Sequence, residues 1–124
     1  MKRLLWTIIP SCLMLLSAAC GSSVTSNDPN AIDTSGSAFS KTQITIKQGQ
    51  SLSFVDNGEI HYLVIGTNAT YQREAGAPDL GGPDGHTISA GQVWVTPPWT
   101  TPGVYHITCT IHPSMNLTVT VAAT

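Results

Sequence analysis

Short runs in which apolar and polar residues alternate constrain the fold of this chain more than any other feature. Between residues 42 and 122, β-branched and aromatic residues recur at every second position, and glycine, proline and asparagine separate the runs. A period of two is typical of a strand with one buried face, and the helical spacing of about three to four residues is missing here. The runs lie at residues 42–47, 51–55, 60–65, 86–90, 92–96, 103–109 and 116–122. They predict an all-β fold, a Greek-key sandwich or barrel of about seven to eight strands.

The alternation also predicts which side of each strand faces the core. The residues expected to point inward are Ile44, Ile46, Leu52, Phe54, Leu63, Ile65, Val93, Val95, Tyr105, Ile107, Leu117, Val119 and Val121. By the same parity, His61 and Cys109 face inward at the ends of their strands. Residues 66–85 form one long irregular stretch, and a connection of that length in a small domain is usually functional or mobile.

The start of the chain has the order of a bacterial export signal. Lys2 and Arg3 precede an apolar stretch at residues 4–16, and small residues then lead to Cys20. The apolar stretch is short for a bilayer span, so the pattern predicts a secretory signal. The segment before Cys20 resembles the cleavage site of bacterial lipoproteins, which implies lipidation of Cys20. Ordinary signal cleavage at the same place remains the alternative.

These features divide the chain into three parts. Residues 1–19 are the predicted signal peptide, and residues 20–38 are a lipidated N-terminus and flexible tether with too little apolar surface to fold alone. Residues 39–124 are expected to form one small domain with one core. Because a lipoprotein cysteine carries more than one acyl chain, we expect stable anchoring to the outer face of the cytoplasmic membrane, on the extracellular or periplasmic side.

Charge and cysteine content narrow the function further. Removal of the signal leaves 3 basic against 7 acidic residues, a formal charge of −4, so nucleic acid is a poor partner. Cys12 lies in the signal and Cys20 is the predicted lipid site, which leaves Cys109 as the one thiol of the domain. A disulfide framework is therefore excluded, and a lone thiol in an oxidising compartment needs another role.

Cys109 and three other side chains are candidate metal ligands. Cys109, His112 and Met115 lie on one short connection between two predicted strands, and His61 begins another strand upstream. Two imidazoles and a thiolate with a weak axial thioether suit one copper ion that cycles between Cu(I) and Cu(II). Zinc would usually close a tetrahedron with more Cys or His, and catalytic copper would keep an open position. The ligand set therefore predicts an electron carrier and no enzymatic activity.

The ligand loop, Cys-x-x-His-x-x-Met with proline after the histidine at residues 109–115, resembles that of the cupredoxins, and among them the amicyanins. The Gly-x-Tyr at residues 103–105 and the loop before His61 are also similar to the family pattern. The resemblance implies a copper-loaded Greek-key sandwich that passes single electrons between redox protein partners, and we expect a monomer. Many relatives have asparagine directly after the upstream histidine, where this chain has Tyr62. This departure leaves the redox potential and the rigidity of the site open.

Two other functions fit parts of the sequence. A copper delivery or storage protein would use the same ligands but release the ion readily. A surface β-sandwich that binds a partner without metal would use none of them, and Cys109 and Met115 would then be ordinary core side chains. For the electron carrier, the expected port is a patch formed by Ile111, His112 and Pro113, through which a transiently docked partner exchanges electrons.

Overall fold

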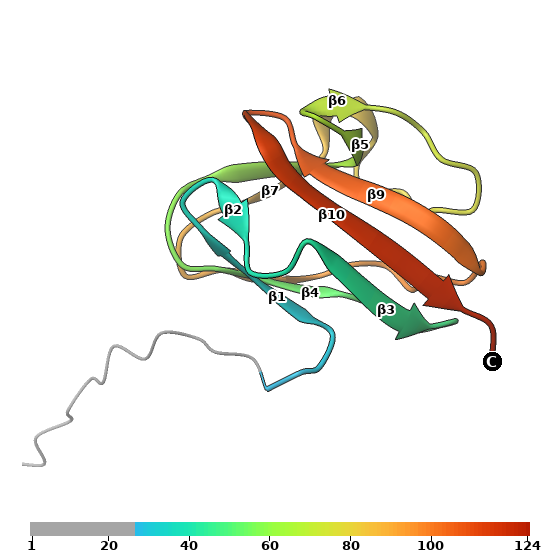
Figure 1. Cartoon of the computed structure of the whole chain (residues 1–124). Coiled ribbons are helices and arrows are strands. Elements are labelled where there is room, and N and C mark those ends of the chain that lie inside the picture. The colour runs from blue at the N-terminus through green and yellow to red at the C-terminus, as the bar shows by residue number, and fades with distance from the viewer. Residues whose placement is uncertain (1–26) are drawn as a thin grey trace, which may run out of the picture.

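The computed structural model describes residues 27–124, which form two packed β-sheets (Figure 1). Within this part of the chain there are ten strands and one short 3-10 helix. They are β1 (Ala31–Ser35), β2 (Ala38–Phe39), β3 (Gln43–Lys47), β4 (Ser53–Asp56), β5 (His61–Thr67), β6 (Thr70–Tyr71), η1 (Gly82–Asp84), β7 (His86–Ile88), β8 (Val93–Val95), β9 (Gly103–Cys109) and β10 (His112–Ala122). The predicted all-β sandwich is confirmed, and each run of alternating residues contains a strand. Among the described residues, no helix has the length and apolar character needed to cross a membrane.

One sheet has the order β2-β1-β4-β8, and the other contains β3, β10, β9 and β5, with β6 and β7 also paired to β5. Most pairs are antiparallel, but β1 lies parallel to β4 and β3 lies parallel to β10. Figure 1 shows β3, β10 and β9 side by side across one layer, with β1 and β4 in the other. This arrangement places the hairpin between β9 and β10 at one end of the sandwich.

The core lies between the two sheets and consists mainly of the residues that parity predicted. Phe54, Leu63, Ile107, Leu117 and Val119 are all fully buried or nearly so. Each such side chain contributes roughly 1.5–3 kcal/mol when it leaves water. The inward faces of β5, β9 and β10 therefore fix these strands in register.

The prediction for Val93 and Val95 was wrong. These residues are 47% and 57% exposed, and Trp94 between them faces inward. The Trp94 ring stacks on Phe54 at 5.9 Å between centroids and on His86 at 3.8 Å. All three residues of the run are apolar, so alternation alone does not define its buried face. On an edge strand, the larger indole fills the gap between the sheets and the valines turn outward.

The sandwich also begins earlier than the expected boundary at residue 39. Strand β1 pairs with β4 and places the fully buried Ile32 opposite Phe54. Residues 31–38 are mostly polar, which made them resemble a tether, but the backbone hydrogen bonds of β1 and its buried Ile32 hold it in the sheet. The predicted signal at residues 1–19, and Cys20 with the first part of the tether, lie outside the described residues.

We expect Ile32→Ala to lower the free energy of unfolding by about 2–5 kcal/mol, because it leaves a cavity between the sheets. Val104→Ala is the control, since Val104 is 57% exposed on β9 and surface changes usually stay within about 0.5 kcal/mol. Denaturant unfolding of the purified metal-free proteins measures both. Equal effects of the two substitutions would mean that β1 adds little to the fold.

Candidate metal centre

Three of the four predicted ligands converge at the end of the sandwich where β9 turns into β10. The Sγ atom of Cys109 lies 3.8 Å from Nδ1 of His61 and 3.6 Å from Nδ1 of His112. The three donor atoms all lie within 4.8 Å of one another. His61 and Cys109 are fully buried, as parity predicted, whereas the His112 side chain is 18% exposed. One imidazole is therefore enclosed and the other reaches the surface.

Strand register produces this convergence. Cys109 ends β9 and His112 begins β10, and the two residues are paired across the hairpin. Leu63 on β5 is the partner of Cys109 on the other side. Because His61 is two residues before Leu63, its side chain points to the same face as those of Leu63 and Cys109. The amide of Thr110 donates a hydrogen bond to the Tyr62 carbonyl at 3.0 Å, which ties the hairpin to β5.

Met115 lies further along β10, where the pairing with β9 is interrupted between His112 and Asn116. Its side chain is buried and belongs to the same core cluster as Cys109. The hydroxyl of Thr108 donates a hydrogen bond to the Met115 carbonyl at 3.0 Å, which anchors this irregular segment to β9. The thioether thus faces the protein interior at the level of the hairpin.

The donor separations fit a metal ion. An ion about 2.0 Å from each nitrogen and about 2.3 Å from the sulfur, in a trigonal plane, requires nitrogen-to-sulfur separations of about 3.7 Å. The distances of Cys109 Sγ to the two imidazoles, 3.6 and 3.8 Å, meet this requirement without movement of the strands. The residues present therefore fit the His, Cys, His and Met set of a type 1 copper centre.

Burial also keeps His61 in the form that binds metal. Desolvation lowers the pKa of His61, the charge of Asp56 partly opposes this effect, and the neighbouring His112 imidazole lowers the pKa further. A lowered pKa keeps the imidazole neutral near pH 7, so one ring nitrogen retains a lone pair for a ligand.

The exposed edge of the centre includes residues that the sequence did not single out. Glu59 Oε2 lies 3.6 Å from His112 Nε2, and Ile60 next to it is 43% exposed. Of the predicted patch, Ile111 is 48% exposed and Pro113 is also exposed. Glu59 and Ile60 immediately precede His61 in the sequence. This position was the one sequence feature that could have placed them near the centre.

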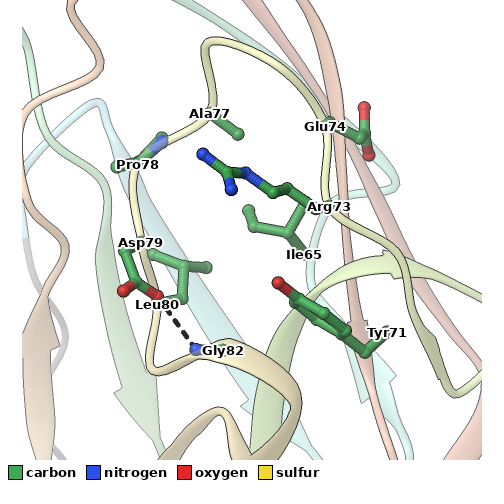
Figure 2. Close-up of a pocket in the computed structure, with 9 residues that line it drawn as sticks. All are labelled: Ile65, Tyr71, Arg73, Glu74, Ala77, Pro78, Asp79, Leu80 and Gly82. Carbon is green, nitrogen blue, oxygen red and sulfur yellow. Dashed lines mark hydrogen bonds between the residues drawn. The ribbon is translucent and has the colours of Figure 1, made fainter.

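A cavity of about 220 Å³ lies apart from these ligands, under the long stretch at residues 66–85 (Figure 2). Ile65 and Leu80 line its apolar part, and Figure 2 shows the Arg73 side chain extended toward Ala77 and Pro78. Glu74 anchors the stretch, because its carboxylate accepts a hydrogen bond from the His106 amide at 3.0 Å.

Comparison with known proteins supports the fold. No protein-family model matches the chain, and no curated protein matches it either. Solved structures do match. Amicyanin from Paracoccus versutus (Thiobacillus versutus) is 20% identical, with 79% of this chain and 85% of that chain covered and a TM-score of 0.57. An oxidised proline-to-glycine variant of amicyanin is 16% identical, with 86% and 88% covered and a TM-score of 0.56. At these identities the match shows the fold: the two-sheet sandwich is a cupredoxin fold similar to that of amicyanin.

Proposed function

We propose that this chain is a type 1 copper protein that carries single electrons, and not an enzyme. The observation that carries the proposal is the convergence of Cys109 Sγ with Nδ1 of His61 and His112 at 3.6–3.8 Å inside a cupredoxin fold. His61, Cys109 and His112 would hold the ion, and Met115 would be a weaker fourth ligand. Bound copper supplies the Cu(I)/Cu(II) couple.

The protein contributes a preformed and dry environment. Cys109 and His61 project from paired strands of one sheet, so their positions are set by the same hydrogen bonds that hold the fold. Neither side chain is exposed to solvent. A site that need not rearrange between oxidation states exchanges electrons with a small reorganisation cost, because fixed protein dipoles replace mobile water.

The burial of Cys109 favours the electron carrier over the copper delivery protein and over the sandwich without metal. A copper delivery protein must release its ion, but here the thiolate is enclosed and its strand is paired on both sides. A surface sandwich without metal has no use for a free buried thiol with two imidazole nitrogens directed at it. The electron carrier accounts for all of these features.

Cys109→Ser should abolish the intense visible band that Cu(II) bound to thiolate produces, with the fold retained, because a hydroxyl lacks the soft sulfur donor. Met115→Leu is the control, since it conserves volume and leaves the three planar donors in place, so an intense band should persist. Absorption during Cu(II) titration, with circular dichroism for the fold, measures both. If wild-type protein shows no such band, the proposed function fails.

The proposed port for electrons is the exposed edge of His112. Ile111 and Pro113 of the predicted patch flank His112 in the chain, and Ile60, next to Glu59, is also exposed and apolar. A small apolar contact suits redox protein donors and acceptors that must bind and leave quickly. The carrier would act as a monomer, with its partners docking one at a time on this patch.

Ile111→Glu should lower the rate of electron self-exchange by about tenfold or more, because two like charges would meet when two copies approach through the patch. Val104→Glu is a matched control, since Val104 is a similarly exposed aliphatic residue near the other end of β9. NMR line broadening of mixed oxidation states gives the rate, and the absorption spectrum verifies the centre. Equal rates in the two variants would place the port elsewhere.

We also propose that the protein is exported and held at the outer face of the cytoplasmic membrane by lipid on Cys20. The support is the order of charged, apolar and small residues before Cys20. Cys20→Ala should then move the protein from the membrane fraction to the soluble fraction, as measured by fractionation and immunoblotting. Unchanged membrane association would exclude this anchor.

A further inference from the structure

A buried carboxylate precedes the ligand His61 by five residues in the chain. Asp56 ends β4 and is fully buried, and an interior carboxylate is costly unless polar groups satisfy it. Its Oδ1 atom accepts hydrogen bonds from the Thr34 hydroxyl at 3.1 Å and from the Gly58 amide at 2.9 Å. Its Oδ2 atom is buried and has no hydrogen-bond partner among the described residues.

The complementary atom is on the enclosed imidazole. His61 Nε2 is also buried and has no hydrogen-bond partner in the described part of the chain, whereas Nδ1 of the same ring faces Cys109. The short loop after Asp56 leads directly to His61, and the charge of Asp56 raises the pKa of His61 against the effect of burial. The two groups therefore interact electrostatically. Asp56 Oδ2 is an acceptor without a donor in the part of the chain that the structure describes, and His61 Nε2 is a ring nitrogen that can carry a proton.

We propose that Asp56 is the positioning residue of this centre: its Oδ2 accepts the proton on His61 Nε2 through one bridging water. A hydrogen bond there holds the proton on Nε2 and leaves the Nδ1 lone pair directed toward Cys109. Metal-bound histidines generally have such a partner on the second nitrogen, and losing it typically reduces metal affinity about 10- to 100-fold. The expected effect on the reduction potential rests on the proposed function. The position of the proton on the His61 ring does not.

This assignment gives the centre an anchor that the sequence did not reveal. The position after His61 is Tyr62, whose carbonyl binds the hairpin through its backbone, so its side chain is not required for that link. Orientation of the His61 ring would come instead from Asp56, which Thr34 of β1 holds in place. The negative charge of Asp56 would also favour Cu(II) over Cu(I), because electrostatic attraction stabilises the more highly charged ion more strongly.

The test compares Asp56→Asn with Asp33→Asn. Asp33 is a suitable control because it lies on the neighbouring strand β1 and also has a buried carboxylate oxygen without a hydrogen-bond partner among residues 27–124. In metal-free wild-type protein, ¹⁵N NMR of the His61 ring should show the Nε2 proton. In Asp56→Asn the amide can donate toward Nε2 through the same water, so the population with the proton on Nδ1 should rise. Asp33→Asn should leave the tautomer unchanged.

Metal binding provides a second readout. The affinity for Zn²⁺ should fall about tenfold or more in Asp56→Asn and stay constant in Asp33→Asn. In copper-loaded protein the ratio of Cu(II) to Cu(I) affinity should fall, which raises the reduction potential by about 59 mV for each factor of ten. If wild-type protein lacks the blue band, the proposed function fails, while the NMR and Zn²⁺ results still decide the role of Asp56.

An unchanged tautomer and unchanged Zn²⁺ affinity in Asp56→Asn would overturn the proposal, and so would equal shifts in the Asp33 control. If Asp56→Asn does not fold, the variant Thr34→Val tests the role of Asp56 instead. That variant removes the hydroxyl that anchors Asp56 and keeps the carboxylate, so Zn²⁺ affinity should fall by a smaller factor. Wild-type affinity in Thr34→Val would then overturn the proposal.

Discussion

The pairing register of β5, β9 and β10 is the constraint on which the candidate centre depends. Leu63 lies opposite Cys109, and Cys109 lies opposite His112, so three adjacent strands set the positions of all the planar donors. A slip of one residue would turn every side chain of a strand to the other face. The buried Leu63, Ile107 and Leu117 oppose such a slip, because it would expose them to water. Hydrophobic packing thus keeps the strands that carry the donors in register.

The same geometry gives the two imidazoles different environments. His61 and the carboxylate of Asp56 are both fully buried, whereas His112 is at the surface with the exposed carboxylate of Glu59 at 3.6 Å. An interior charge acts strongly because water does not screen it, whereas a surface charge is weakened by solvent and salt. Asp56 is therefore suited to orient a ligand and set a potential. Glu59 is suited to influence which partners approach the apolar patch.

The sequence predicted most of the sandwich because strands with one buried face leave a clear alternation, as in residues 103–109. It indicated a candidate ligand set because Cys109, His112 and Met115 lie within seven residues of one loop. It failed where the pattern was absent or ambiguous. The run at residues 92–96 has apolar residues on both faces, and β1 is too polar to resemble a core strand. The sequence could not suggest the proposed role of Asp56, because its burial and its hydrogen bond to Thr34 depend on the pairing of β1 with β4.

A hydrogen bond connects the start of the folded domain to Asp56, the proposed positioning residue. Thr34 on β1 donates to the Asp56 carboxylate, and β1 is parallel to β4 with Thr34 opposite Asp56. Because the Thr34 hydroxyl is buried, it has no water to bond with in place of Asp56. The segment that resembles a tether by composition therefore supports the residue that we propose to position His61. A truncation that began the domain at residue 39 would remove both a core strand and this support, so the boundary affects the centre as well as the stability of the fold.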